Sequence, residues 1–405
     1  MKVEPLCPGN SDRSETRLTI FGASVRAAAV AAWRIGMIPA AADLFGDRDL
    51  QAIARWYRVE DYPRGFLAVA PRLPKSPWMY TGGLENHPEL VERLAAQQPL
   101  LGNPAPVLRT VRNPWLVAGC LRRHGLPFPE PYLTRPQDRP SCRWLMKPIH
   151  ASGGSGIQEV VEDQAIPALD RHYFQRFLTG PTLSAVYVAA GRCAQLWGVT
   201  RQWTGLAWTG ARPFAYCGSL GPLDLPTPIL GKFQQIGQCL AATFDLRGLF
   251  GIDTILSGRQ VFVLEVNPRY TSSVEVLEHG LEGSALRAHG EACRDRRLPT
   301  MPRRRGSRWY GKAILFAPHR VRVPAEFTEF ADRLGCLECR DTWSPLADLP
   351  STDAEIGPGR PMVTVRASAE SSRRVIERLQ QLATRVRAVC RLEQAAAPPL
   401  TPNLH

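Results

Sequence analysis

The segment VFVLEVNPR, residues 261–269, carries the side chains whose types and spacing are best suited to chemistry. Alternate residues of a strand point to one face, so Glu265 and Asn267 would share a face at the end of an apolar strand. Carboxylate and amide oxygens are the ligands that a hard cation such as Mg²⁺ takes from proteins. The pattern therefore predicts part of a metal site, and the alternative is an ordinary amphipathic hairpin with solvated acids.

A third oxygen ligand, Asp253, lies in the preceding strand-like run, residues 250–256, before a turn at Ser257-Gly258. A two-residue loop would turn Asp253 to the face opposite Glu265, whereas a loop of odd length returns it to the same face. The metal hypothesis requires the odd loop. We therefore predict an odd number of residues between Leu256 and Val261, with Asp253 near Glu265.

A lysine followed by a glycine loop predicts a phosphate site. Of the 50 basic residues only five are lysines, and Lys147 stands near the end of the strand-like run WLMKP, residues 144–148. The loop SGGSG, residues 152–156, follows it, and such loops bring backbone N–H groups close to phosphate oxygens. The order excludes a Walker loop, in which the lysine follows the glycines. The alternative is a solvent-exposed hairpin loop.

The first part of the chain is typical of an open parallel α/β unit. A strand at 18–21, a glycine turn, a helix at 25–35 and a second strand ending at Asp43 are followed by expected strands at 66–70 and 78–81. The last of these runs into GGLEN, and such sheets bind ligands at the carboxyl ends of their strands. Glu85 and Asn86 are therefore candidate substrate residues, and the alternative for Asn86 is a cap of the next helix.

The composition indicates which binding partners and which cellular compartment to expect. The net charge of +13 raises the question of nucleic acid, but the basic residues are scattered and do not interleave with aromatic ones, so we expect no specific nucleic-acid partner. No uncharged apolar run is long enough to cross a membrane, so we expect no membrane partner. The ten cysteines are dispersed, and the single C-x-x-C, Cys336 and Cys339, has no second pair to complete a zinc site. Dispersed cysteines favour a reducing cytoplasm.

Lys147, the glycine loop, the segment YFQRFL at residues 173–178 and the D…E-x-N-P-R hairpin occur in the order found in the ATP-grasp superfamily of ligases, which they resemble. The chain looks most like the predicted ATP-dependent carboligases related to biotin carboxylase. The resemblance implies an α/β (α+β) protein with the ATP-grasp fold. It implies a Rossmann-like pre-ATP-grasp domain at 1–105, an ATP-grasp domain at 106–297 and a small C-terminal cap at 298–394. The Ala- and Pro-rich composition of residues 395–405 predicts a disordered tail.

The resemblance also implies site residues, with ATP and Mg²⁺ or Mn²⁺ as cofactors. The family's first nucleotide-binding lysine is absent, and Arg109 and Arg112 are the nearest substitutes. Arg269 is assigned to the phosphoryl group, and its alternative role is a salt bridge to Glu275 or Glu278. The implied residues are, for catalysis, Arg269 and Lys147; for ATP, Lys147, Ser152, Gly153, Gly154, Ser155, Gly156, Gln175, Phe177 and Leu178; for the metal, Asp253, Glu265 and Asn267; and for substrate, Glu85, Asn86, Arg201 and Tyr270.

The implied function is that of an ADP-forming carboxylate–amine ligase acting through an acyl phosphate. Its partners would be a small-molecule carboxylic acid and an amine or amino acid, with cofactor biosynthesis as a candidate setting and a homodimer left open. The alternative is a nucleotide-binding regulatory protein that has the fold and little or no catalysis. The absent first lysine motivates this second hypothesis.

Overall fold

The computed structural model describes residues 16–136, 142–160, 171–337 and 343–392 of the 405-residue chain. The expected tail at 395–405 and Cys339 lie outside the described residues. None of the helices in the described ranges combines the length and the apolar character that crossing a membrane requires.

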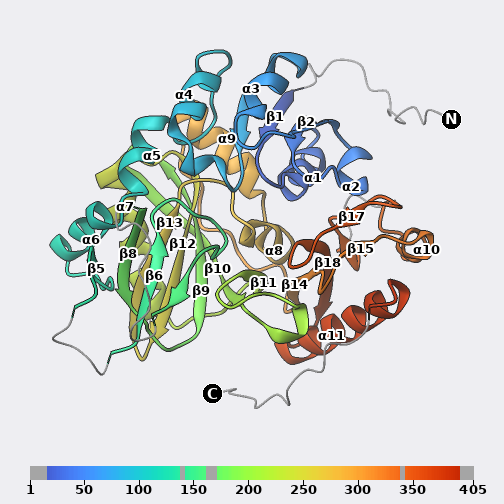
Figure 1. Cartoon of the computed structure of the whole chain (residues 1–405). Helices are drawn as coiled ribbons and strands as arrows, with labels where there is room; N and C mark the ends of the chain where they lie inside the picture. Colours follow the sequence, from blue (N-terminus) through green and yellow to red (C-terminus); the bar gives the residue numbers. More distant parts are fainter. Residues whose placement is uncertain (1–15, 137–141, 161–170, 338–342, 393–405) are drawn as a thin grey trace.

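A parallel four-stranded sheet with the order β3-β2-β1-β4 forms the N-terminal region, as the sequence predicts (Figure 1). Alanines of α1 are fully buried, which brings that helix close to the strands. The carboxyl end of β4 leads directly into the GGLEN segment. The elements are β1 (Arg17–Phe21), α1 (Arg26–Arg34), β2 (Ile38–Asp43), α2 (Arg48–Gln51), β3 (Arg55–Arg58), α3 (Gly65–Val69), η1 (Ala70–Arg72), β4 (Trp78–Tyr80), η2 (Leu84–Asn86) and α4 (Pro88–Ala95).

The strand expected at 66–70 is wrong, because these residues form α3 and the start of η1. Phe66, Val69 and Ala70 are buried, and this spacing of three to four residues is the period of one helix face. A short apolar run has no alternation to distinguish a strand from a buried helix, and the packing decided between them.

A smaller antiparallel sheet with the order β5-β8-β6-β7 carries Lys147 and the segment 173–178. Two helices precede it, and Asn113 caps the second by accepting hydrogen bonds from the backbone N–H groups of Trp115 and Leu116. The elements are α5 (Ala105–Val111), α6 (Pro114–Arg123), β5 (Pro131–Tyr132), β6 (Trp144–Pro148), β7 (Gln158–Glu159) and β8 (His172–Arg176).

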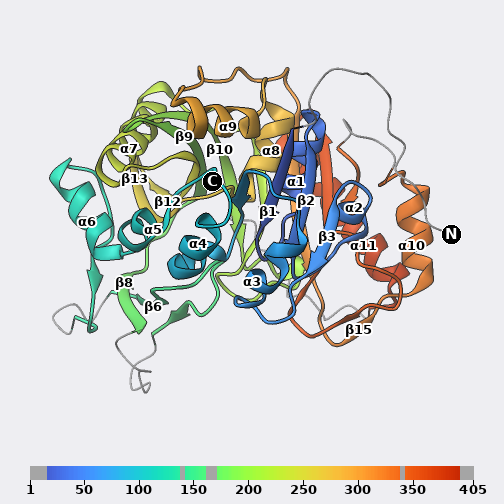
Figure 2. The same cartoon turned by 90° about the horizontal axis from the view of Figure 1, so that it is seen from above.

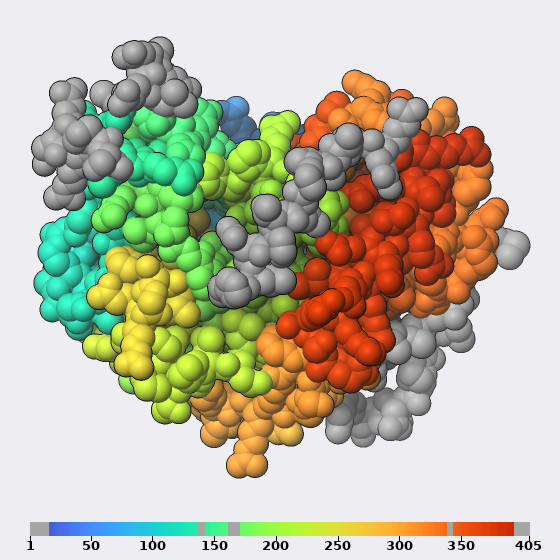
Figure 3. All heavy atoms as spheres, turned by 90° about the horizontal axis from the view of Figure 1, so that it is seen from below, coloured from blue at the N-terminus to red at the C-terminus, as the bar shows by residue number. Residues whose placement is uncertain are grey.

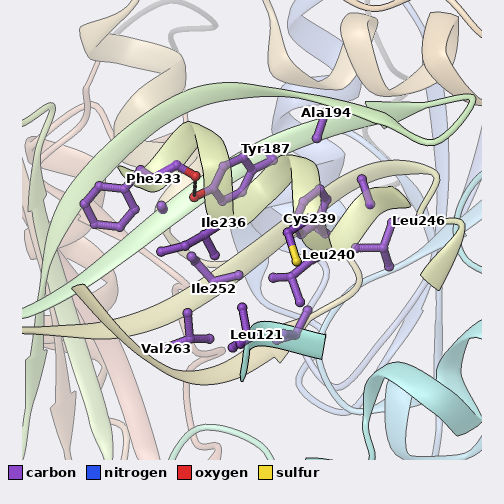
Figure 4. Close-up of a cluster of buried hydrophobic side chains, with 14 of the residues drawn as sticks. Leu121, Tyr187, Ala194, Phe233, Ile236, Cys239, Leu240, Leu246, Ile252 and Val263 are labelled. Atoms are coloured by element: carbon purple, nitrogen blue, oxygen red, sulfur yellow. Dashed lines mark hydrogen bonds between the residues drawn. The ribbon is translucent and has the colours of Figure 1, made fainter. Parts of the chain in front are cut away.

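An eight-stranded sheet with the order β13-β12-β9-β10-β11-β14-β18-β16 runs through the centre of the molecule (Figures 1 and 2). Helix α7 covers part of it, and their contact forms a core around Tyr187, Phe233, Ile236 and Leu240 (Figure 4). The elements are β9 (Thr182–Ala190), β10 (Cys193–Thr204), η4 (Ala207–Thr209), β11 (Tyr216–Gly221), α7 (Thr227–Phe244), β12 (Gly248–Ser257), β13 (Gln260–Asn267), α8 (Ser273–Gly280) and α9 (Ala285–Asp295).

The C-terminal segment adds three of its strands, β14, β18 and β16, to this same sheet through the pairing of β14 with β11, whereas β15 and β17 form a separate two-stranded sheet. It also has a hydrophobic cluster of its own around Phe327, Val365 and Leu379, which supports the proposal of a cap at 298–394. Seen from below, the C-terminal segment (orange and red) packs directly beside residues from the middle of the chain (green) (Figure 3). The elements are β14 (Trp309–Phe316), β15 (Val321–Arg322), α10 (Ala325–Arg333), β16 (Leu346–Ala347), β17 (Glu355–Ile356), β18 (Pro361–Ala369) and α11 (Ser372–Val389).

Candidate nucleotide and metal site

The hairpin of β12 and β13 brings Asp253 opposite Glu265, as predicted, although not by the predicted route. The prediction of an odd loop is wrong, because Leu256 pairs with Val261 and Ser257 with Gln260, which leaves an even number of residues. The odd residue lies instead within β13, where the register shifts between Asp253 and Thr254 and leaves Leu264 without a partner. This β-bulge turns Glu265 to the face of Asp253.

The resulting acidic cluster suits a hard cation. Asp253 accepts hydrogen bonds from Gln202 (Nε2 to Oδ1, 3.1 Å) and Asn267 (Nδ2 to Oδ2, 3.0 Å). Burial and the nearby charge of Glu265 raise the pKa of Asp253 to about 6. Two carboxylates held close together repel each other, and a bound cation removes that repulsion. With the amide oxygen of Asn267, the donor set fits Mg²⁺ or Mn²⁺.

Arg112 is the substitute for the absent first lysine that reaches the site. Its guanidinium, almost fully buried, forms an ion pair with Glu265 (Nη1 to Oε1, 2.5 Å) and donates to Asn86 Oδ1 (3.0 Å) and to the backbone oxygen of Ala151 (2.7 Å). Arg109, in contrast, is exposed and pairs with Glu92 on the surface. The structure therefore separates two candidates that the sequence left equal.

Lys147 is buried at the end of β6, and its ammonium group lies beside the acidic cluster. Its Nζ donates to Gln175 Oε1 (3.1 Å) and to the backbone oxygen of Leu264 (3.4 Å), the residue of the bulge. Gln175 is held in turn by its own donation to the backbone oxygen of Pro129 (2.7 Å). Two oxygen acceptors thus orient the lysine. Among the described residues, no carboxylate forms an ion pair with it.

The residues of the glycine loop do not all line the same cavity. Gly153 and Gly154 line the large cavity described below, and Gly154 has φ +78°, where an added Cβ would lie 2.0 Å from the backbone oxygen of Phe214. The backbone N–H of Tyr216 donates to the oxygen of Gly153 (3.0 Å), so the loop closes against the β10–β11 connection. Ser155 lines only a smaller neighbouring cavity, and Gly156 lines neither of them.

Glu85 joins the N-terminal sheet to the rest of the site. It is 1% exposed, and its carboxylate accepts hydrogen bonds from the backbone N–H of Gly83 (2.6 Å), from Ser152 Oγ (2.9 Å) and from Arg269 Nε (2.7 Å). Burial raises the pKa of Glu85, but the charges of Arg269 and Arg112 lower it further, so the net pKa is below its usual value. Asn86 also contacts Ser152, by donating to its Oγ (2.9 Å).

Arg269 is therefore held by a partner that the sequence did not indicate. The alternative salt bridge to Glu275 or Glu278 is wrong, because Arg269 pairs with Glu85. Its Nη2 also donates to Asn267 Oδ1 (3.1 Å). The guanidinium is thus fixed between the N-terminal sheet and the acidic cluster.

One cavity of about 590 Å³ is lined by several of these groups. Its volume falls within the range of pockets that hold ligands of nucleotide size. The lining residues that the sequence predicts are Lys147, Gly153, Gly154, Gln175, Phe177, Leu178, Asp253, Glu265, Asn267 and Arg269. Those that the sequence analysis did not assign include Arg176, Ser184, Gln202, Thr204, Tyr216, Ser272 and Ser273.

None of the four predicted substrate residues is in the lining of this cavity. Glu85 contacts it indirectly, through Arg269, Asn86 contacts Ser152 of the glycine loop, and the other two lie elsewhere. Arg201 is exposed on β10, where alternation turns it to the face opposite its neighbour Gln202, which does line the cavity. Tyr270 is 3% exposed and packs in a hydrophobic cluster with Val274 and Leu277. The alternation of β10 is the signal that favours Gln202, but it requires knowing which face of the strand meets the cavity.

The fold and this cavity define the class of protein. Residues 111–273 match the family model of the ATP-grasp domain. The chain therefore carries an ATP-grasp domain, and the resemblance and the fold class drawn from the sequence are confirmed.

Known proteins extend the comparison to most of the chain. Three solved structures each superpose with a TM-score of 0.66: carboxyaminoimidazole ribonucleotide synthase from Aspergillus clavatus (16% identity, 93% of this chain, 99% of that chain), L-amino acid ligase from Bacillus licheniformis (13%, 92%, 98%) and biotin carboxylase from Campylobacter jejuni (11%, 89%, 89%). An uncharacterised protein of Methanocaldococcus jannaschii is 23% identical over 238 residues, which cover 55% of this chain. The chain matches 50% of the length of that relative.

Proposed function

We propose that this protein is an ATP-dependent, ADP-forming ligase that joins a small-molecule carboxylic acid to an amine or amino acid. The observation that carries the proposal is the cavity that Lys147, Gly153 and Gly154 of the glycine loop, the acidic cluster and Arg269 line together. A cation, a phosphate-binding loop and a fixed guanidinium are what transfer of a phosphoryl group needs. The structural similarity to L-amino acid ligase supports the same reaction class.

Each group has a role in this proposal. Asp253, Glu265 and Asn267 would hold Mg²⁺ or Mn²⁺, which supplies neutralisation of phosphate charge when bound. Lys147 supplies a further positive charge, and Gln175 orients it. Arg269, fixed by Glu85, presents its planar group toward the same cavity. Phe177 and Leu178 supply apolar surface for the adenine ring at the end of the cavity formed by β8 and the residues after it.

The proposed reaction has two displacements. A carboxylate oxygen of the acid attacks the γ-phosphorus of ATP, the bond from that phosphorus to the β,γ-bridging oxygen breaks, and ADP leaves. The amine nitrogen then attacks the carbonyl carbon of the acyl phosphate, inorganic phosphate leaves and the nitrogen loses a proton. The protein contributes mainly position and charge, because this chemistry needs little covalent help.

Part of the cavity is lined by neutral polar side chains. Gln202, Thr204, Tyr216, Ser272 and Ser273 come from β10, β11 and the start of α8. Hydroxyl and amide groups orient a substrate by hydrogen bonds without demanding a fixed charge. We place the acid and the amine in this part.

The test is ADP release by the purified protein with ATP and Mg²⁺, while carboxylic acids and amines are added singly and in pairs. The proposal expects ADP to form at a substantial rate only with an acid present, and amide product to appear only with a matching pair. ATP binding with no stimulation by any acid, across amino acids and other small acids, would contradict a ligase.

That contrary result would favour a nucleotide-binding regulatory protein, and one observation supports this second candidate. Arg112 and Arg269 already pair with Glu265 and Glu85. Lys147, whose acceptors are neutral oxygens, is therefore more available to a phosphate than either of these arginines. Binding of ATP that shifts the thermal stability without turnover separates the two candidates.

A further inference from the structure

Two cysteines and a histidine gather on the surface of two neighbouring helices, away from the cavity residues named above. Cys120 Sγ lies 3.3 Å from Cys239 Sγ, and a ring nitrogen of His124 lies within 4.8 Å of both sulfurs. It is the one grouping of three His, Cys, Asp or Glu residues at this spacing that occurs in residues 16–136, 142–160, 171–337 and 343–392. The sequence shows no zinc motif here, since the residues are far apart in the chain.

Helical spacing explains how the cluster forms. Cys120 and His124 are four residues apart at the carboxyl end of α6, so they share one face of the helix. Cys239 and Thr243 have the same spacing in α7, and Thr243 Oγ1 lies 3.2 Å from Cys120 Sγ. The faces of α6 and α7 that carry these residues therefore contact each other.

The surroundings differ from those of ordinary core cysteines. Cys120 and Cys239 are 0% and 5% exposed and belong to the hydrophobic core around α7, where Figure 4 shows Cys239 next to Leu240. A buried thiol in a core usually acts only as a small apolar group. Here the thiols meet a hydroxyl and an imidazole, and His124 is exposed, which gives an ion a path from solvent.

We propose that Cys120, Cys239 and His124 form a binding site for Zn²⁺. Thiolate sulfur and imidazole nitrogen are ligands that Zn²⁺ prefers, and three protein ligands leave a fourth position for water. Zinc–sulfur bonds of about 2.3 Å place two ligating sulfurs roughly 3.8 Å apart in a tetrahedron. The two sulfurs, 3.3 Å apart here, would therefore move slightly apart on binding. Binding displaces the proton of each thiol to solvent, and zinc–sulfur bonds replace the S–H bonds.

One ring nitrogen of His124 already has a backbone partner. Its Nδ1 lies 2.9 Å from the backbone oxygen of Cys120. Histidines that ligate metals commonly donate one ring N–H to such an acceptor and bind through the other nitrogen. The site also lies at the carboxyl end of α6, where the helix dipole favours a cation.

A zinc ion bound here would link α6 to α7. Helix α6 carries Pro114 and Val117, which line the small cavity beside Arg112 and Lys147, whereas α7 packs on the central sheet. The site is chemically distinct from the acidic cluster, because sulfur ligands select Zn²⁺ over Mg²⁺. A structural ion here therefore stabilises the helix pair without entering the proposed reaction.

The test uses the reduced, full-length protein after removal of metals with a chelator. We expect a single Zn²⁺ to bind and to raise the thermal midpoint, and Co²⁺ in its place to show the absorption of thiolate-to-cobalt charge transfer. Cys120→Ser and Cys239→Ser should each lower the Zn²⁺ affinity by at least ~100-fold and weaken this absorption. His124→Ala changes an exposed side chain, so it should fold normally and still lose about 10-fold or more in affinity.

Cys390→Ser is the matched control, since Cys390 is also a buried cysteine but lies in the C-terminal cluster. It should bind Zn²⁺ like the unmodified protein. The proposal fails if the unmodified protein gives no thiolate absorption with Co²⁺, or if the Cys120, Cys239 and His124 variants keep full Zn²⁺ affinity. It also fails if the reduced protein binds no Zn²⁺ and the two sulfurs are recovered only as a disulfide.

Discussion

Lys147 differs at the residue scale from the other lysines that the structure describes. Lys312 is buried in an ion pair with Glu275 (2.7 Å), and Lys232 donates to the backbone oxygen of Arg259 near the hairpin turn. Lys147 lines the cavity and is held by neutral oxygens, so its charge remains available to an anion.

Lys147→Ala should weaken ATP binding by ~10- to 100-fold, because a charged hydrogen bond contributes about 1.5–3 kcal/mol. Titration calorimetry with ATP and Mg²⁺ measures the change. Lys232→Ala is the control, since it removes a lysine outside the cavity and should leave the affinity unchanged. Equal affinity in Lys147→Ala and the unmodified protein would show that Lys147 does not contact phosphate.

Arg269→Lys should keep ATP affinity within a few-fold and lower ligase turnover by ~10²-fold, the scale of removing one preorganised charge stabiliser. The reason is geometric: Arg269 bonds Glu85 through Nε and Asn267 through Nη2, and a lysine cannot form both bonds and present a planar group. Steady-state ADP formation with the cognate acid and amine, beside calorimetry with ATP, tests this. If weaker ATP binding fully explains the loss of turnover, Arg269 does not stabilise the transition state.

At the scale of elements, the glycine loop and the β10–β11 connection close the cavity together. Gly154 makes the tightest approach, because its φ of +78° and the nearby oxygen of Phe214 leave no room for a side chain. The contact matters for function, since Gly153 and Phe214 both line the cavity.

Gly154→Ala should lower ATP affinity by ~10-fold or more, because the loop must move away from Phe214 and a left-handed alanine costs about 1–2 kcal/mol. Gly258→Ala is the matched control, with φ +58° and open space around it at the hairpin turn. Both substitutions carry the backbone cost, but only Gly154→Ala has the clash. Calorimetry should therefore separate them, and equal ATP affinities would argue against the closed loop as the binding form.

At the scale of the whole molecule, one buried acid joins three parts of the chain. Glu275 of α8 pairs with Arg26 of α1, with Lys312 of β14 (2.7 Å) and with Arg366 of β18 (3.1 Å). Burial raises the pKa of Glu275, but these three cations lower it further, so its net pKa is well below its usual value. Because α8 begins at the cavity, this cluster sets how the N-terminal and C-terminal regions meet the site.

Glu275→Gln should lower the free energy of unfolding at neutral pH by about 3–5 kcal/mol, because it leaves three buried cations without their shared anion. A lowered pKa in the folded state means that the stabilising effect is present above pH about 4.5 and is lost as pH falls through the folded pKa. Urea unfolding at several pH values measures both effects. The gap between the two proteins should shrink in acid, and a gap that stays constant would contradict the ionised carboxylate.

Glu282→Gln is the control for this measurement, because Glu282 is exposed just beyond α8. It should change the free energy of unfolding by less than about 0.5 kcal/mol. A similar loss in both variants would mean that the effect of Glu275→Gln does not come from the buried cluster.

The sequence by itself determined the local order of the chemistry. Alternation along one strand was enough to place Glu265 and Asn267 on the same face, and the order of Lys147, glycine loop and hairpin was enough to indicate the ATP-grasp fold. These features depend on neighbours within a few residues, where backbone geometry alone decides which side chains share a face.

The tertiary structure alone decided what meets across long distances in the chain. The ion pair of Arg112 with Glu265 spans 153 positions, Glu85 with Arg269 spans 184, and Cys120 with Cys239 spans 119. The bulge at Leu264 likewise replaced the predicted odd turn, although both arrangements bring Asp253 to Glu265. No local pattern encodes such contacts, because they depend on which faces of distant elements pack together.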